Sequence, residues 1–314
     1  MNKIKQFICI LLLLTIHQNG KACDVCGGAI GAGGSDVIPG VFQNYIGIRS
    51  NIRDFRSEHL TLFEQESPIR TREWFCTTEL HGRYSPIRRF QIFGFLPVNS
   101  VTKEEDEVFS TIVGLGDFRV RMNYLSIDQT TDDSHFMNLF AGATLKMPTG
   151  RYSFNGNESH HFHPNMLPGT GTWDIGFHTD FLFRSNSLGG ILSANYFIRG
   201  TNKYNYQFGN ISAGMASAFY KKDFLNASLL FELGIIASHL QTDVDLRWNE
   251  EQIYSQGWAV LPTAKATFFK GNWACSLSYG KPAFQHLALG QVDQKNMMEM
   301  NIIYFLKTTS NENN

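Results

Sequence analysis

Apolar and polar residues alternate with a period of two through most of this chain, and this alternation limits the possible folds more than any other feature. Within residues 116–127, for example, apolar Val120 and Met122 alternate with charged Arg119 and Arg121. Successive side chains of a β-strand point to opposite faces, so the pattern predicts a strand with one apolar and one polar face. Its repetition along the chain predicts an all-β fold.

Twelve segments with this character are predicted as strands. Most are about ten residues long, which is the length of a tilted strand that crosses a bilayer. The predicted strands are Asn44–Arg53, Glu73–Tyr84, Phe90–Asn99, Gly116–Ile127, His135–Met147, Thr172–Phe183, Gly189–Arg199, Asn210–Lys222, Ala227–Leu240, Trp258–Lys270, Trp273–Gly280 and Asn296–Lys307.

The ionisable residues of these strands gather on one face, and the opposite face is almost free of charge. A water-soluble sandwich would also contain strands with outward charges and strands that are wholly apolar. A membrane barrel instead turns apolar side chains to lipid and polar ones to its lumen on nearly every strand. We therefore predict a closed antiparallel transmembrane β-barrel of about 12 strands. The predicted lumen residues include Glu79, Arg83, Asp117, Arg119, Arg121, Lys146, Asp174, His178, Asp180, Arg199, Glu232, Lys265 and Glu299.

The connections between the predicted strands alternate between long and short, which is a second indication of a barrel. If the N-terminus lies in the periplasm, the odd-numbered connections are extracellular loops and the even-numbered ones are periplasmic turns. The long connections are about 54–71, 100–115, 148–171, 200–209, 241–257 and 281–295. The short ones are 85–89, 128–134, 185–187, 223–226 and 271–272.

The beginning of the chain reads as an export signal. Lys3 and Lys5 precede an apolar run, and small residues follow it, which is typical of a secretory signal peptide over residues 1–22. A lipoprotein with an acylated Cys23 is the less favoured alternative, because Lys21 fits that signal poorly. The mature protein then has no apolar run long enough for a membrane-spanning helix. These features place it in the outer membrane of a Gram-negative bacterium.

Three further segments complete the domain organisation. Residues 23–42 are Gly-rich, show no alternation, and are predicted to plug the lumen or to form a periplasmic clip. Residues 43–307 form the barrel, and residues 308–314 are predicted to be disordered. The net charge of −1 argues against a nucleic-acid partner, which leaves the lipid bilayer and a small solute as the expected partners.

Two clusters in the sequence resemble metal ligands. His160, His161 and His163 fall within four residues, and imidazole is a common ligand of transition metals. The alternative is an ordinary loop, because of the neighbouring Pro and Gly residues. Cys23 and Cys26 form a CxxC motif that can bind a soft metal or close into a disulfide, and the oxidising compartment favours the disulfide. No cofactor is predicted.

Several short motifs resemble those of a known family of outer-membrane proteins. The chain is similar to transporter-like barrels of the meta-pathway of phenol degradation family, in its Bacteroidetes-type form. The resemblance implies a barrel and passage of small, hydrophobic molecules across the outer membrane, and it transfers no catalytic residue. The motifs that carry it are Lys146–Gly150 followed by Pro168–Asp174, with support from Cys23–Gly27, Glu79–Tyr84, Gly114–Asp117 and Phe208–Asn210.

The leading functional hypothesis is an outer-membrane channel or facilitated transporter for small molecules, including hydrophobic and aromatic ones. Asp117, Arg119 and Arg121 are the densest group of predicted lumen charges and are expected to form a constriction. The first alternative is a structural barrel, or one that binds a ligand or metal, with a closed lumen. The second is an outer-membrane lipid hydrolase, for which the predicted outward-facing candidates are His135, His239 and Ser217, although no catalytic motif is present.

Overall fold

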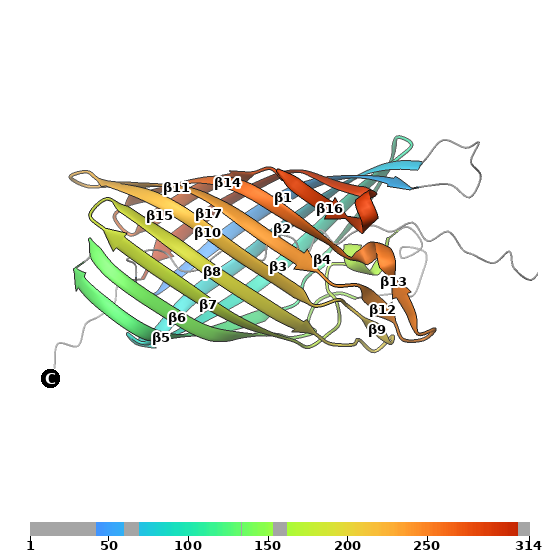
Figure 1. Ribbon diagram of the computed structural model, residues 1–314, viewed down its shortest axis with the longest axis horizontal. Helices are drawn as coiled ribbons and strands as arrows, with labels where there is room; N and C mark the ends of the chain where they lie inside the picture. The colour runs from blue at the N-terminus through green and yellow to red at the C-terminus, as the bar shows by residue number, and fades with distance from the viewer. Residues whose placement is uncertain (1–41, 60–68, 133, 153–161, 307–314) are drawn as a thin grey trace, which may run out of the picture.

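The computed structural model describes residues 42–59, 69–132, 134–152 and 162–306, and shows a closed antiparallel β-barrel of 12 strands. Figure 1 shows the strands running obliquely along the long axis of the barrel. The strands are β1 (Tyr45–His59), β2 (Ile69–Ile87), β3 (Phe90–Glu105), β5 (Arg119–Asp132), β6 (His135–Lys146), β7 (Asp174–Ser185), β8 (Leu188–Arg199), β10 (Ile211–Asp223), β11 (Ser228–Leu240), β14 (Gly257–Lys270), β15 (Trp273–Gly280) and β17 (Val292–Phe305).

The first and last strands close the barrel. β1 and β17 pair antiparallel from Tyr45 opposite Phe305 to Ser57 opposite Val292. Each of the other strands pairs with its neighbour in sequence order, apart from the short elements described below. All twelve predicted strands are present, so the fold prediction is confirmed. Closure leaves no open sheet edge along the wall, as a lipid environment requires.

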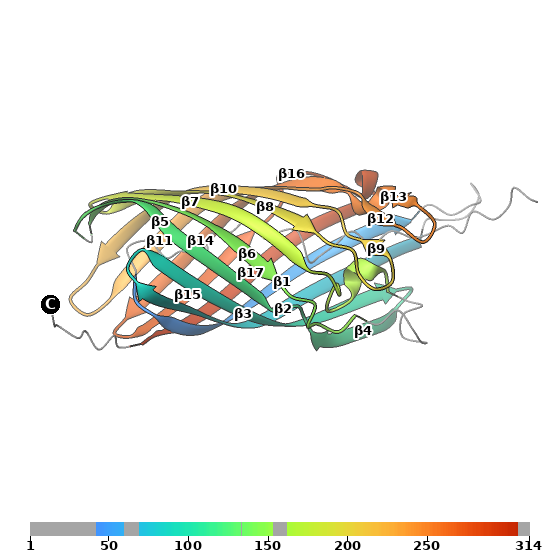
Figure 2. The same ribbon diagram turned by 90° about the horizontal axis from the view of Figure 1, so that it is seen from below.

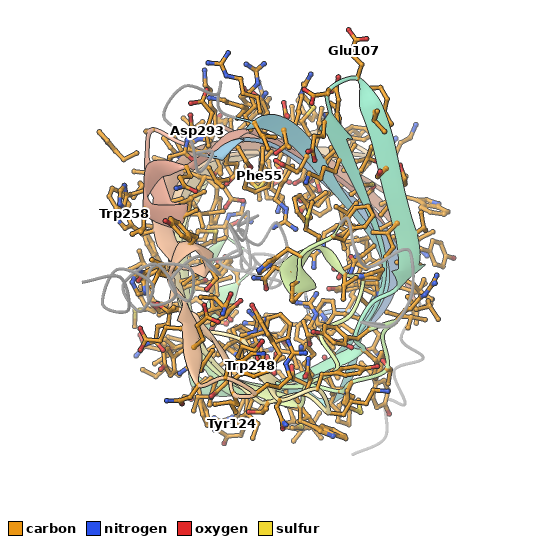
Figure 3. The ribbon with its side chains drawn as sticks, turned by 90° about the vertical axis from the view of Figure 1, so that its right-hand side faces the viewer. Phe55, Glu107, Tyr124, Trp248, Trp258 and Asp293 are labelled. Atoms are coloured by element: carbon orange, nitrogen blue, oxygen red, sulfur yellow. The ribbon has the colours of Figure 1, made fainter. Side chains whose placement is uncertain are left out.

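The two faces of the wall differ in the way that the alternation predicted. Trp258 and Tyr124 point away from the barrel axis, whereas Phe55 points toward it (Figure 3). The outer surface exposes large apolar side chains on every strand except β6, which in water would be an extensive hydrophobic surface. In the middle of the strands the charged side chains lie on the inner face, whereas some charged residues near the strand ends, such as Arg56 and Asp293, are exposed. No helix among the described residues is long and apolar enough to span a bilayer.

The two ends of the barrel are built differently, and both views of the ribbon show this (Figures 1 and 2). At one end, here called the short-turn end, tight turns join β2 to β3, β7 to β8, and β14 to β15. Asn186 and Gly271 adopt positive φ in two of these turns, as two-residue hairpin turns require. The opposite end, here called the long-loop end, carries the long connections. The predicted alternation of connections is therefore confirmed.

The long-loop end contains strands that the sequence pattern did not predict. Residues 100–115, expected to be a loop, extend β3 and form β4 (Val108–Leu115), which pairs with it. β16 (Phe284–Leu287) pairs with β14 and β17 above β15. A separate small sheet combines β9 (Tyr206–Gln207), β12 (Asp243–Asp245) and β13 (Glu250–Gln252). β9, β12, β13 and β16 have only two to four residues, too few for an alternation to be recognised, and the eight residues of β4 include no charged residue that would mark a polar face.

The connection between β6 and β7 folds into the barrel. Its residues 162–170, here called the inserted loop, include the short 3-10 helix η2 (Pro164–Met166), which lies inside the ring of strands in Figure 3. Met166 is 0% exposed and packs in one apolar cluster with Phe55 and Phe75 of the wall. The inserted loop therefore fills the lumen toward the long-loop end.

The two adjacent aromatic residues near the end of β17 point to opposite faces of the wall. The sequence favours an aromatic belt of both Tyr304 and Phe305 at this end, but Phe305 points inward and packs against Tyr45. Tyr304 does point outward, and its ring lies 4.9 Å from that of Trp273. Adjacent residues of a strand cannot share a face, which is the reason for the difference.

Candidate functional site in the barrel interior

A row of charged side chains crosses the inner face of four neighbouring strands. Arg119 on β5 lies opposite Lys146 on β6, Lys146 opposite Asp174 on β7, and Asp174 opposite Arg199 on β8. The antiparallel register places these residues side by side on the lumen face. With Arg49, Glu79 and Asp117, described next, they form what is here called the charged wall.

Glu79 connects two arginines of the charged wall. Its Oε1 accepts a hydrogen bond from Arg49 Nε at 2.8 Å, and its Oε2 accepts one from Arg119 Nη2 at 2.9 Å. The carboxylate is almost completely buried. Two guanidinium groups on one buried carboxylate satisfy its lone pairs and leave a positive excess at this part of the wall.

Lys146 has the same connecting role between two carboxylates. Its Nζ lies 2.7 Å from Asp174 Oδ2 and 3.1 Å from Asp117 Oδ2. Arg199 approaches the same Asp174 oxygen at 3.7 Å. The four side chains therefore neutralise one another, and removal of Lys146 would leave Asp117 without its cation and Asp174 with Arg199 alone.

A second group of predicted lumen residues lies deeper in the wall. Arg121 forms an ion pair with Asp180, which also accepts a hydrogen bond from Ser193 at 2.7 Å. His178 Nε2 lies 2.7 Å from Asn123 Oδ1. At the short-turn end Arg83 donates to the Gln43 carbonyl and lies over the Tyr45 ring, with its guanidinium carbon 5.0 Å from the ring centre. These residues are held in place by hydrogen bonds within the wall.

Asp117 fastens the β6–β7 connection to the wall. Its Oδ1 accepts a hydrogen bond from the Gly150 N–H at 2.9 Å, and its Oδ2 accepts from the Thr170 N–H at 2.8 Å and the Thr170 hydroxyl at 2.7 Å. Asp117 precedes β5 and lies outside the strands. Burial opposes its ionisation, but Lys146 and these hydrogen bonds outweigh burial and hold the pKa of the carboxyl below its usual value. Asp117 is therefore a charged latch for both ends of this connection.

The glycines around the latch allow close backbone contact. A Cβ atom on Gly150 would lie 2.7 Å from the Gly116 carbonyl carbon, and one on Gly169 would lie 2.7 Å from that of Gly150. Gly116 and Gly150 belong to two of the sequence motifs noted above, and Gly169 belongs to a third. The structure thus brings three separate motifs into one cluster. Close backbone contact there explains why glycine occupies these positions.

A cavity of about 380 Å³ lies inside the barrel beneath the inserted loop. One side of it is the charged wall. Another side, formed by β8, β10 and β11, is apolar and includes Ile191, Met215 and Ile236. Hydroxyl-bearing residues of β14 and β15, among them Thr263 and Ser278, continue the lining. The cavity can therefore hold a molecule that has both a polar and an apolar part.

The fold has a counterpart among solved structures. It is shared with the COG4313 outer membrane channel from Pseudomonas putida F1. The two are 13% identical, the match covers 86% of this chain and 100% of the other, and the TM-score is 0.64.

Weaker matches include the translocator domain of the autotransporter NalP from Neisseria meningitidis, with 10% identity, coverage of 84% and 88%, and a TM-score of 0.42. The NanC porin matches with 12% identity, coverage of 83% and 100%, and a TM-score of 0.44. No protein-family model matches the chain, and no curated protein matches it in sequence. The likeness to the Pseudomonas channel is one of fold.

All thirteen residues predicted for the lumen face lie in the barrel interior. Nine of them line the cavity and four are buried elsewhere in the wall. Sequence reasoning missed Arg49 and Arg53, which also line the cavity. Their signal was available, because both alternate with the outward residues Ile48 and Ile52. The predicted residues that line the cavity are Glu79, Asp117, Arg119, Lys146, Asp174, Arg199, Glu232, Lys265 and Glu299, and those that do not are Arg83, Arg121, His178 and Asp180.

Most of the suggested metal ligands cannot be placed. His160, His161, Cys23 and Cys26 lie outside the described residues, as do the signal peptide and most of the Gly-rich segment. His163 is described and caps η2, where its Nδ1 accepts a hydrogen bond from the Asn165 N–H at 3.4 Å. Within the described part of the chain no three metal-ligating side chains gather.

The residues considered for lipid hydrolysis do not come together. Ser217 was expected on the outer face, but it points inward, where its hydroxyl is buried. His239 lies on the outer face opposite Ser212, and no hydrogen bond joins the two. The parity of β10 explains the error, because Ile211 and Phe219 on that strand are buried and Ser217 shares their face.

Proposed function

We propose that this protein is a channel of the bacterial outer membrane that passes small molecules with an apolar or aromatic part. The observation that carries the proposal is the interior cavity, which joins the charged wall to an apolar side formed by β8, β10 and β11. The apolar outer face and the fold shared with the COG4313 channel support the membrane location and the transport role. The resemblance to the phenol-degradation family supports aromatic compounds as the solute class.

The inserted loop determines how such a channel opens. It packs against Phe55 and Phe75 inside the barrel, and Asp117 holds its end at Thr170. A solute that enters from the long-loop end must displace these contacts. The proposed gating step is therefore release of Thr170 and Gly150 from Asp117, and the neighbouring Arg119 and Arg121 are the proposed constriction.

Liposome swelling tests the proposal. The full-length protein is reconstituted, and swelling rates are compared with empty liposomes for a panel of small sugars, aliphatic acids and aromatic compounds. We expect wild-type protein to pass at least one class of solute, and Asp117→Asn to raise the rate several-fold because the latch loses its charge. Asp293→Asn, an exposed position at the barrel exterior, is the matched control and should behave as wild type.

Failure of every solute with both wild type and Asp117→Asn would overturn the channel proposal. It would favour the second candidate, a binding barrel with a closed lumen, for which the docking of the inserted loop is the supporting observation.

The Gly-rich segment is proposed as a further plug, and its deletion should then raise the swelling rate. Metal binding by the His-rich loop and the CxxC motif stays a proposal, which zinc titration of wild type and a triple His160/His161/His163→Ala variant can test.

A further inference from the structure

Two opposite charges on the cavity lining contrast with the paired side chains of the charged wall. Glu232 on β11 and Lys265 on β14 occupy directly opposed positions in the antiparallel register, and both line the cavity. Both side chains are half-buried. Neither makes a hydrogen bond or an ion pair with any of the residues that the structure describes. The two charges are therefore available to a molecule in the cavity.

The surroundings of this pair are amphipathic. Met215, Leu230 and Ile236 form an apolar surface on the side of Glu232. On the side of Lys265, hydroxyl groups come from Thr267 and, across the register, from Ser278. A ligand at this position finds an anion, a cation, hydrogen-bonding hydroxyls and apolar contacts within one part of the lining.

We propose that Glu232 and Lys265 bind a small zwitterion with an apolar side group, of the α-amino acid class. Directly opposed residues of antiparallel strands have Cβ atoms about 5 Å apart. An α-amino acid carries its ammonium and carboxylate groups on a single carbon atom, so one molecule can reach both side chains. Its ammonium donates to Glu232, its carboxylate accepts from Lys265, and its side group rests on Met215 and Leu230.

The charges on the lining discriminate against simple ions. An organic anion is attracted by Lys265 but repelled by Glu232. An organic cation is attracted by Glu232 but repelled by Lys265. The next acidic residue on the lining, Glu299, faces Arg53 and is partly neutralised by it. The zwitterion is the one charge type that satisfies both side chains. This inference rests on the proposed function in that it names the solute class of the same cavity.

A matched series of ligands tests the inference by equilibrium dialysis with the full-length protein in detergent. The probes are radiolabelled L-phenylalanine, 3-phenylpropanoate, which lacks the ammonium group, and 2-phenylethylamine, which lacks the carboxylate. We expect phenylalanine to bind about tenfold more tightly than either of the other two probes, because each of them leaves either Glu232 or Lys265 without a partner. Equal affinity for phenylalanine and 3-phenylpropanoate would overturn the inference.

Substitutions supply the second comparison. Glu232→Gln should weaken phenylalanine binding about tenfold and leave 3-phenylpropanoate unweakened, whereas Lys265→Met should weaken phenylalanine and leave 2-phenylethylamine unweakened. The exposed residues Glu251 and Lys270 provide the controls Glu251→Gln and Lys270→Met. An unchanged phenylalanine affinity in both cavity variants would contradict the proposed site. If a variant does not fold, the ligand series on wild type still decides.

The outcomes separate this inference from the channel proposal. Dialysis measures binding without transport. Liposome swelling with an uncharged sugar measures transport of a solute that does not need Glu232 or Lys265. Swelling without selective phenylalanine binding would retain the channel and reject the zwitterion site. Selective binding without any swelling would retain the site and reject the channel.

Discussion

Lys146 is the residue on which the charged wall depends most. Its side chain is close to Asp117 and Asp174, both almost completely buried, and it also donates to Thr172 at 3.1 Å. Its position was predictable from the alternation of β6, because residues of even number on that strand face inward. Its partners were not predictable, because the register between strands is absent from a single sequence.

Substitution of Lys146 by methionine should destabilise the barrel strongly. Asp117 loses its cation and Asp174 keeps only Arg199, and loss of one partner of a buried pair costs about 3 kcal/mol or more. Lys295→Met is the control, because Lys295 pairs with Asp293 at the surface, where an ion pair contributes about 0–1 kcal/mol. Denaturant unfolding of the protein in lipid vesicles measures both. A loss for Lys146→Met no larger than that of the control would contradict the role given to the charged wall.

The inserted loop is the element that the sequence described least well. Its Pro and Gly residues predicted a loop, and Phe162 already stood out there as an apolar residue without a strand. The structure buries Phe162 with Met166 and Leu167 inside the barrel. Alternation could not reveal this, because a loop in the lumen does not repeat with any fixed period. Strand positions can be predicted because each strand has one side toward lipid and one toward the lumen. The docking of a loop depends instead on particular side-chain contacts.

Gly169→Ala should release the inserted loop. The added methyl group would lie 2.7 Å from the Gly150 carbonyl carbon, a distance at which the backbone must move. We expect faster liposome swelling than with wild type, while the strand content in circular dichroism is unchanged. Gly214→Ala is the control, because its methyl group would meet nothing closer than 3.5 Å. A swelling rate equal to that of the control would show that close packing at Gly169 does not hold the loop.

The whole molecule is a closed wall with an apolar outer face and with charged side chains on its inner face, and this level of structure was the most predictable. The number of strands, their order and the alternation of short turns and long loops all follow from the period-two pattern, because a bilayer imposes the same requirement on every strand. β4, β16 and the small sheet of β9, β12 and β13 lie at the long-loop end. The bilayer does not impose its pattern there, and the sequence did not reveal them.

An outward arginine in the middle of the wall tests the membrane position of the barrel. Leu233 on β11 is 68% exposed on the outer face, and Leu233→Arg should cost about 2–4 kcal/mol in a bilayer. Leu225, 98% exposed in a turn at the short-turn end, gives the control Leu225→Arg, with an expected cost of about 1 kcal/mol or less. Both are measured by denaturant titration in vesicles. Equal costs would place Leu233 outside the hydrocarbon layer.

The pairing of β1 with β17 has a consequence for biogenesis. Tyr45 is among the first barrel residues to be synthesised and Phe305 is among the last, yet they are neighbours in the finished wall. Until the ribosome has released β17, β1 and β15 would each present an unpaired edge, which is a template for aggregation. Contacts between such distant residues also form slowly. A chain that stops before Val292 lacks the strand that closes the barrel, and we expect it to be degraded.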